Sequence, residues 1–307
     1  MVRVRKAVGA ALVAVLVSCS SASVTRSDAP SPVVTAMPSP TPTPAASVAA
    51  TPSPVSTATP APNWNELPSA ANDVEPLTQQ LLMLEAAIRD PKVTGAQLDW
   101  MGHLQQLVYS RLQDYPDWKA QVLAALPAEQ RTAVTGSLDA GKELRKLSGP
   151  IPRNLPDWKI VTPAPVEDLM SYYRDAEAQF GVPWYYLAAI HLVETRMGRI
   201  RGLSSAGAQG PMQFMPATWA AYGKGDINSD HDAILGAARY LKASGAPDDM
   251  QRAFFAYNHS QAYVNALLDY AAVMRDDPAA YRGYHGWQVY YPTQDGPVLL
   301  SVGWTKT

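Results

Sequence analysis

The pattern of apolar and polar residues divides the 307-residue chain into regions of different character. A short apolar run at the N-terminus is followed by residues 20–62, which are rich in Pro, Ser, Thr and Ala and have no hydrophobic period. From residue 63 onward apolar residues recur at helical spacing, with an interruption at the proline-containing segment 148–164. In residues 286–307 two mainly apolar stretches, WQVYY and PVLLSVGW, bracket a turn-rich segment, which is typical of a hairpin. The pattern predicts an all-α fold with a small C-terminal β-hairpin, whose loop is expected at residues 292–296.

Residues 63–147 are predicted to form an antiparallel helical accessory region. Helices are expected over 76–90 and 94–115, and Pro116 and Pro127 are expected to open two more. The pattern leaves two arrangements open. The region either packs on the domain that follows the linker 148–164 or spaces that domain from the N-terminal stretch.

The most apolar helix is predicted over residues 183–197, with Gly198 just past its end. Apolar side chains cover almost all of its sides, which is typical of a helix at the centre of a domain. Its one carboxylate, Glu194, lies in the same stripe as Leu187 and Ile190. Burial and the negative end of the helix dipole both disfavour the charged carboxylate. We therefore expect Glu194 to keep its proton near neutral pH, as a general acid must.

A glycine-spaced loop over residues 198–210 follows this helix and leads into a short second helix. Glycine allows the backbone to turn tightly and to approach a ligand closely. The loop delivers Met212, Gln213 and Phe214, an amide between two apolar residues. An amide in such surroundings can hydrogen-bond a flat, hydroxyl-rich ligand, whereas the alternative interpretation of these residues is ordinary core.

Three ordered motifs then suggest a family. The sequences ETRMG at 194–198, GAQGPMQFMPATW at 207–219 and AFFAYNHS at 253–260 together resemble the SLT-type lytic transglycosylase catalytic domain, which is related to goose-type lysozyme. The resemblance covers roughly residues 165–275. It implies a lysozyme-like catalytic domain, placed here at 165–285, that acts on the glycan strands of peptidoglycan without a cofactor.

The resemblance also implies a mechanism. Glu194 would protonate the oxygen between N-acetylmuramic acid and N-acetylglucosamine, and the acetamido group of the same sugar would attack C1. Glu194 would then take the proton of the C6 hydroxyl, which closes a 1,6-anhydro ring. A helper role is implied for Thr195, which would position Glu194. Substrate-binding roles are implied for the remaining motif residues, namely Met212, Gln213, Phe214, Tyr257 and Asn258.

Two other functions compete with this interpretation. A hydrolase on the same fold would let water resolve the intermediate, and Asp226 or Asp230 could hold that water. A non-catalytic glycan-binding lipoprotein is the alternative from another class. A binding module has no need of a half-buried acid, so the order of preference is lyase, hydrolase and binder.

A metal site is a further interpretation of the stretch 226–232, where Asp226, Asn228, Asp230 and Asp232 alternate. An EF-hand needs Gly at its sixth position and Glu at its twelfth, and this stretch has neither. Helix capping by Ser229, with Asp232 three residues on, is the favoured alternative. His103 has no neighbouring metal-ligand pattern and is expected to be structural.

Residues 1–19 are predicted to be a secretory signal, with Arg3, Arg5 and Lys6 before an apolar run. The sequence LVSC at 16–19 resembles the lipobox of bacterial lipoproteins, and Cys19 is the only cysteine in the chain. Lipidation of Cys19 is favoured over a plain signal peptide. The protein is then expected to be exported and anchored to the cell membrane facing the wall, with 20–62 as a tether.

Charge and missing motifs exclude other classes. The formal net charge of −2, without a basic stripe, argues against nucleic acid as a partner. The chain contains no G-x-S-x-G, H-E-x-x-H, P-loop or Cys pair. The sequence therefore has no motif that would support a serine-hydrolase, zinc-protease, nucleotide-binding or redox function.

Overall fold

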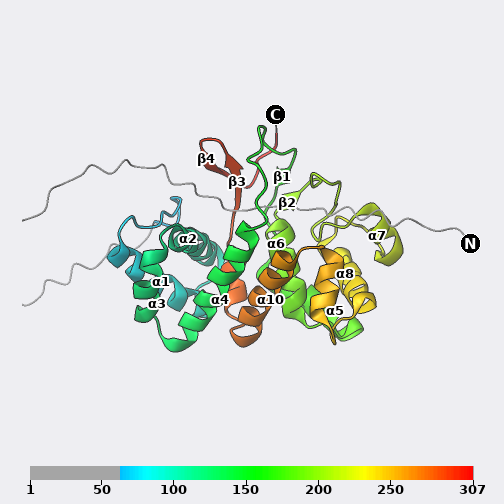
Figure 1. Cartoon of the computed structure of the whole chain (residues 1–307), viewed down its shortest axis with the longest axis horizontal. Helices are drawn as coiled ribbons and strands as arrows, with labels where there is room; N and C mark the ends of the chain where they lie inside the picture. Colours follow the sequence, from blue (N-terminus) through cyan, green and yellow to red (C-terminus); the bar gives the residue numbers. More distant parts are fainter. Residues whose placement is uncertain (1–62, 307) are drawn as a thin grey trace, which may run out of the picture.

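The computed structural model describes residues 63–306, which form a mostly helical protein with two small two-stranded sheets (Figure 1). The predicted signal, the lipidation site Cys19 and the tether lie outside the described residues. Within 63–306, none of the helices combines the length and the apolar character that a membrane span requires. The all-α prediction is confirmed for the described part of the chain.

The accessory region contains the four helices that the sequence predicts. Pro116 occupies the first turn of the third helix, and Pro127 precedes the fourth. Thr94 stands at the N-cap of the second helix, but its side chain makes no capping hydrogen bond. The helices are α1 (Val74–Arg89), α2 (Gly95–Asp114), α3 (Pro116–Ala125) and α4 (Ala128–Arg145).

Seven helices follow the linker. Ser229 caps one of them as predicted, because its side-chain oxygen accepts the backbone N–H of Asp232 at 3.3 Å. The carboxylate of Asp232 accepts the N–H of Asp226 at 2.9 Å, so it closes the preceding turn. The helices are α5 (Val166–Phe180), α6 (Trp184–Thr195), α7 (Pro216–Tyr222), α8 (Asp230–Ser244), α9 (Met250–Tyr257), α10 (Gln261–Asp276) and α11 (Ala280–His285).

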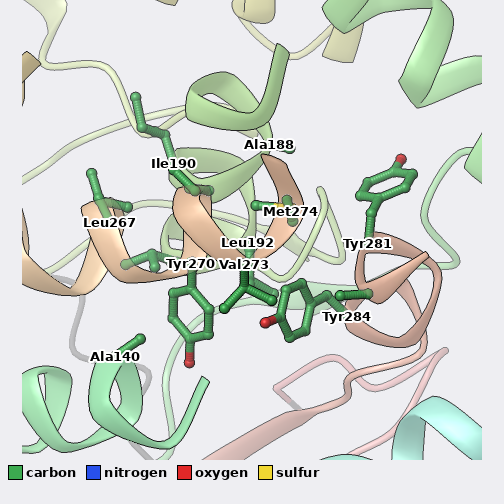
Figure 2. Close-up of a cluster of buried hydrophobic side chains, with 14 of the residues drawn as sticks. Ala140, Ala188, Ile190, Leu192, Leu267, Tyr270, Val273, Met274, Tyr281 and Tyr284 are labelled. Carbon is green, nitrogen blue, oxygen red and sulfur yellow. The ribbon is translucent and has the colours of Figure 1, made fainter. Parts of the chain in front are cut away.

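The accessory helices and the later helices share one hydrophobic core. Helix α4 packs along α10, and α2 packs against α11. Figure 2 shows Ala140 of α4 close to Tyr270 of α10, with Tyr284 of α11 in the same cluster. Polar contacts cross the same boundary: the hydroxyls of Ser137 and Tyr284 lie 2.6 Å apart. Of the two arrangements that the sequence left open for this region, the structure has the packed one.

The segment 148–164 connects the accessory helices to the later helices and also contains a short strand. Strand β1 (Lys159–Ile160) lies within it and pairs antiparallel with β2 (Ile200–Arg201). The C-terminal segment joins on the other side of β1, because the N–H of Ile160 donates to the carbonyl of Trp304 at 3.0 Å. The sequence analysis predicted only a linker here and did not predict this strand. A two-residue strand has no period to detect, since its partners lie far away in sequence.

The predicted C-terminal hairpin is present as β3 (Val289–Thr293) and β4 (Gly296–Leu300). Its loop is shorter than the expected 292–296, because Thr293 pairs with Gly296 and leaves a two-residue turn. Pro292 and Pro297 lie opposite each other in the paired region. The pairing continues because a two-stranded ribbon tolerates residues that lack an N–H on its outer edges. A small second core joins the two sheets and consists of Ile160, Ile200, Val289 and Leu300.

Candidate active site

Glu194 lies in the last turn of α6, buried with 6% of its surface exposed. Burial raises the pKa of its carboxyl from 4.5 to about 8, because the protein interior solvates the charged form poorly. This raised pKa agrees with the expectation that Glu194 keeps its proton near neutral pH. A carboxylic acid in this state can donate a proton to a leaving group.

The hydroxyl of Tyr263 donates a 2.6 Å hydrogen bond to Oε1 of Glu194. Tyr263 lies in the first turn of α10 and is itself buried. This bond favours the carboxylate form, so it lowers the pKa of Glu194 and opposes part of the effect of burial. The sequence analysis missed Tyr263. The one available signal was a tyrosine shortly after the Tyr-Asn pair, and nothing local connects it to Glu194.

Thr195 joins the end of α6 to the loop that follows. Its hydroxyl donates to the carbonyl of Pro211 at 2.6 Å and accepts the N–H of Gly198 at 3.0 Å. The residue is fully buried. Thr195 thus fixes two points of the loop relative to the helix turn that carries Glu194.

The helix ends two residues before the predicted end because the backbone turns left-handed. Arg196 and Met197 have φ angles of 54° and 59°, and Gly198 follows with φ 82°. A Cβ at position 198 would lie 2.5 Å from Oδ1 of Asp230, so only glycine fits there. The chain therefore turns sharply after Thr195. The loop that follows begins beside the end of the helix that carries Glu194.

Gln213 sits in a tight turn with φ 50°. Its side-chain Nε2 donates to the carbonyl of Gly210 at 2.8 Å, and its backbone N–H donates to the same oxygen at 3.0 Å. Gln209 and Phe214 exchange two backbone hydrogen bonds around this turn. Strained left-handed positions outside glycine are uncommon and gather at functional sites.

Met212 and Phe214 are buried, with 0% and 2% of their surface exposed. The ring of Phe214 packs against those of Trp219 and Tyr257 at 5.2 and 6.2 Å between centroids. Both side chains therefore belong to the core, the alternative that the sequence left open. Their contribution to substrate binding is therefore indirect: they hold Gln213 in its turn.

The Tyr-Asn pair lies at the end of α9. The hydroxyl of Tyr257 donates to the carbonyl of Met212 at 2.6 Å, so its partner is the loop and not the Glu194 carboxyl. Burial raises the pKa of Tyr257, and the nearby charge of Glu194 contributes to the same effect. Asn258 is 5% exposed, and its Oδ1 has no hydrogen-bond partner within residues 63–306. A buried amide oxygen without a partner costs about 1–3 kcal/mol.

The two aspartates considered for holding water have other partners. Asp230 accepts from Arg201 at 2.8 Å and lies 3.5 Å from Nε2 of His191. These two neighbours outweigh the effect of burial and lower the pKa of Asp230. Asp226 accepts the N–H of Asn228 at 2.9 Å in the turn before α8. In the part of the chain that the structure describes, no group of three or more His, Cys, Asp or Glu side chains could hold a metal ion.

Comparison with known proteins agrees with this geometry. Residues 171–274 match the family model "Transglycosylase SLT domain". Membrane-bound lytic murein transglycosylase F of Thiobacillus denitrificans is 29% identical over 124 residues, which cover 38% of this chain and 26% of that protein. The chain thus aligns with only about a quarter of that relative, and no solved structure matches significantly. Glu194, Gln213 and Tyr263 all lie inside the matched range, so residues 171–274, which hold the candidate active site, are similar to the transglycosylase SLT domain.

Proposed function

We propose that this protein is a peptidoglycan lytic transglycosylase that cleaves the β-1,4 bond between N-acetylmuramic acid and N-acetylglucosamine and leaves 1,6-anhydro ends. One observation carries the proposal: Glu194 is buried within the range that matches the SLT family, and this burial raises the pKa of its carboxyl to about 8. The family match supports the reaction class. The anhydro product follows from the chemistry argued below.

In the first step Glu194 gives its proton to the glycosidic oxygen, and the bond from that oxygen to C1 breaks. The carbonyl oxygen of the 2-acetamido group of the same muramyl residue bonds to C1 and forms a cyclic oxazolinium. Glu194 is now a carboxylate. The hydroxyl of Tyr263 stabilises that charge, because hydrogen bonds to an ionised acceptor are stronger than those to a neutral one.

In the second step the carboxylate of Glu194 takes the proton of the C6 hydroxyl. The C6 oxygen bonds to C1, the acetamido carbonyl leaves, and the 1,6-anhydro ring closes. No water enters the product, and Glu194 is protonated again for the next turnover. The C6 hydroxyl is held near C1 by the sugar itself, which is an advantage in effective concentration over bulk water.

A hydrolase on the same fold remains the second candidate, and the charges around Glu194 argue against it. A glycosidase with two catalytic carboxylates holds them about 5–9.5 Å apart. A second carboxylate so close would raise the pKa of Glu194, yet burial and Tyr263 are the causes of its shift within the described residues. The carboxylate of Asp230 already contacts Arg201 and His191. We therefore assign the nucleophile to the substrate.

The remaining motif residues support the substrate in this proposal. Asn258 offers a buried Oδ1 without a hydrogen-bond partner among residues 63–306, which suits the N–H of an acetamido group. Gln213 contacts the saccharide from its left-handed turn, and Tyr257 fixes the backbone of that turn through Met212. Thr195 holds the loop to the helix of Glu194.

The proposal includes export and a lipid anchor at Cys19, supported by the signal and lipobox pattern and by the membrane-bound description of the relative. Cys19→Ala should move the protein out of the membrane fraction and leave its activity on isolated walls unchanged. Cell fractionation followed by immunoblotting measures this. Retention of the Ala variant in the detergent-extractable membrane would contradict the anchor.

Product masses test the reaction itself. Purified sacculi are digested with the wild-type chain and with Glu194→Gln, and the soluble muropeptides are separated and weighed. We expect muramyl ends that are one water lighter than reducing ends, and at least ~10²-fold less release by the Gln variant. Reducing ends in the majority would replace the lyase by the hydrolase. Equal release by the Gln variant would remove Glu194 from the mechanism.

A further inference from the structure

A groove of about 620 Å³ lies on the protein surface beside the two small sheets. Three segments form it: the linker at 147–158, the loop at 203–205 and the hairpin at 291–292. Its volume is in the range of small-molecule binding sites. Glu194 and the other residues of the candidate active site do not line it. Two of its three walls also lie outside the matched range 171–274, so the SLT domain alone does not contain this groove.

The walls of the groove are tied to one another. The indole Nε1 of Trp158 donates to the carbonyl of Leu203 at 3.0 Å. The rings of Trp158 and Tyr291 meet edge to face at 5.6 Å between centroids. The hydroxyl of Tyr291 donates to the carbonyl of Asn154 at 3.3 Å. A site whose walls are already joined loses little conformational freedom when it binds a ligand.

The lining combines apolar surface with neutral polar groups. Ile151 and Leu155 are each 37% exposed and Leu203 is 58% exposed, so apolar atoms face solvent on both sides of the groove. Serines and Asn154 lie among them, and Asp157 is the one charged residue of the lining within the described part of the chain. A pyranose ring has the same division, with C–H groups on its faces and hydroxyls on its edges. The lining has no basic side chain that would bind the carboxylates of a stem peptide, so it fits the uncharged sugar rings of a glycan strand.

One short loop connects the groove to the acid. Leu203 follows Glu194 by nine residues, so the two lie at most about 30 Å apart. The hydroxyl of Ser204 accepts the N–H of Ala208 at 3.0 Å, and the next residue, Gln209, is paired with Phe214 in the turn of Gln213. The groove and the candidate active site thus share a continuous stretch of backbone.

We propose that this groove binds sugar residues of the same glycan strand, away from the bond that Glu194 cleaves. The inference rests on the proposed function and adds a strand-holding site to it. A long strand occupies both sites, whereas a short fragment reaches only the active site. Binding through a second linked site raises the affinity for long strands without changing the chemical step.

The test uses the full chain with the double substitution Leu155→Ser and Leu203→Ser, which removes apolar surface from two walls. Leu67→Ser is the matched control, because Leu67 is 74% exposed and lies outside the groove. We expect KM for long, uncross-linked glycan strands to rise about fivefold to tenfold, as for the loss of two partly buried apolar contacts. The values of kcat, and the kcat/KM for a peptide-free tetrasaccharide, should match those of the control. Thermal unfolding of each variant verifies that it is folded.

Equal KM values for long strands in the double variant and the control would overturn the inference while leaving the proposed function intact. A wild-type chain that cleaves neither substrate would instead overturn the proposed function. In that case co-sedimentation measures the binding of the long strands to the full chain directly. The comparison of the double variant with the control then shows whether the groove binds saccharide. A synthetic peptide of residues 38–62 is added as a competitor. Displacement of the glycan by this peptide would assign the groove to the proline-rich segment of the chain and overturn the saccharide assignment.

Discussion

The hydroxyl of Tyr263, in the first turn of α10, donates a hydrogen bond to Glu194 in the last turn of α6, 69 positions earlier in the sequence. Burial raises the pKa of the acid, and this bond alone among the contacts of the described residues opposes the shift. The two effects together leave the acid protonated at neutral pH but able to ionise. Such a balance is what a residue needs when it acts first as an acid and then as a base.

The first prediction concerns this bond. Tyr263→Phe should raise the pKa of Glu194 above about 8, because the carboxylate loses the donor that stabilises it. The alkaline limb of the kcat/KM profile should move to higher pH, and the rate at pH 7 should fall about tenfold. Tyr240→Phe is the control, since the hydroxyl of Tyr240 donates to the carbonyl of Ala256. An alkaline limb at the wild-type pH would show that Tyr263 does not act on the acid.

The second prediction concerns stability and pH. Glu194 has a raised pKa in the folded state, so the unfolded chain releases its proton first as pH rises from 4.5 to about 8. The wild type should therefore lose stability across this window relative to Glu194→Gln, which cannot ionise. The difference should reach on the order of 3–5 kcal/mol near pH 8. Urea unfolding of both proteins at several pH values measures it, and a constant difference would mean that the acid ionises freely in the folded state.

The third prediction concerns Thr195. Thr195→Val keeps the shape but leaves the carbonyl of Pro211 and the N–H of Gly198 unpaired in the interior. The free energy of unfolding should fall by about 2–4 kcal/mol. Thr195→Ser keeps the hydroxyl and should recover most of this loss in denaturant unfolding. If Ser is as destabilising as Val, the methyl group and not the hydrogen bonds holds the loop.

The fourth prediction concerns the accessory helices. Because α4 and α10 share one core, the full chain should unfold in a single transition, with tryptophan fluorescence and circular dichroism giving the same midpoint. Removal of residues 63–147 should expose that core and give an insoluble product. Two separate transitions, or a soluble and folded 148–307 fragment, would show that the regions are independent.

The local parts of the fold could be predicted from the sequence. The helix starts at Pro116 and Ser229 could be predicted because prolines and capping residues influence the backbone within only a few residues. Glu194 could be singled out because one carboxylate in an otherwise apolar helix must be buried or face a cleft. Its raised pKa then follows from burial.

The parts that depend on distant partners could not be predicted. Strand β1 forms only by pairing with β2, some forty residues later. The hydroxyl of Tyr263 contacts Glu194 only when α6 and α10 pack together. The motif around Met212 and Phe214 was interpreted partly as a binding surface, whereas both side chains face the core. Sequence spacing shows that residues are near one another along the chain. It does not show which of them point inward.

The pairing of β1 with both β2 and the C-terminal segment has a practical consequence for handling the protein. Lys159 pairs with Thr305 on one side and with Arg201 on the other, so β1 lies between the C-terminal segment and β2, the short strand that begins six residues after Glu194. A purification tag or fluorescent protein joined directly behind Thr305 is therefore attached close to the backbone that follows α6. Fusion partners are better inserted in the turn at Gln294–Asp295, which is exposed at the tip of the hairpin.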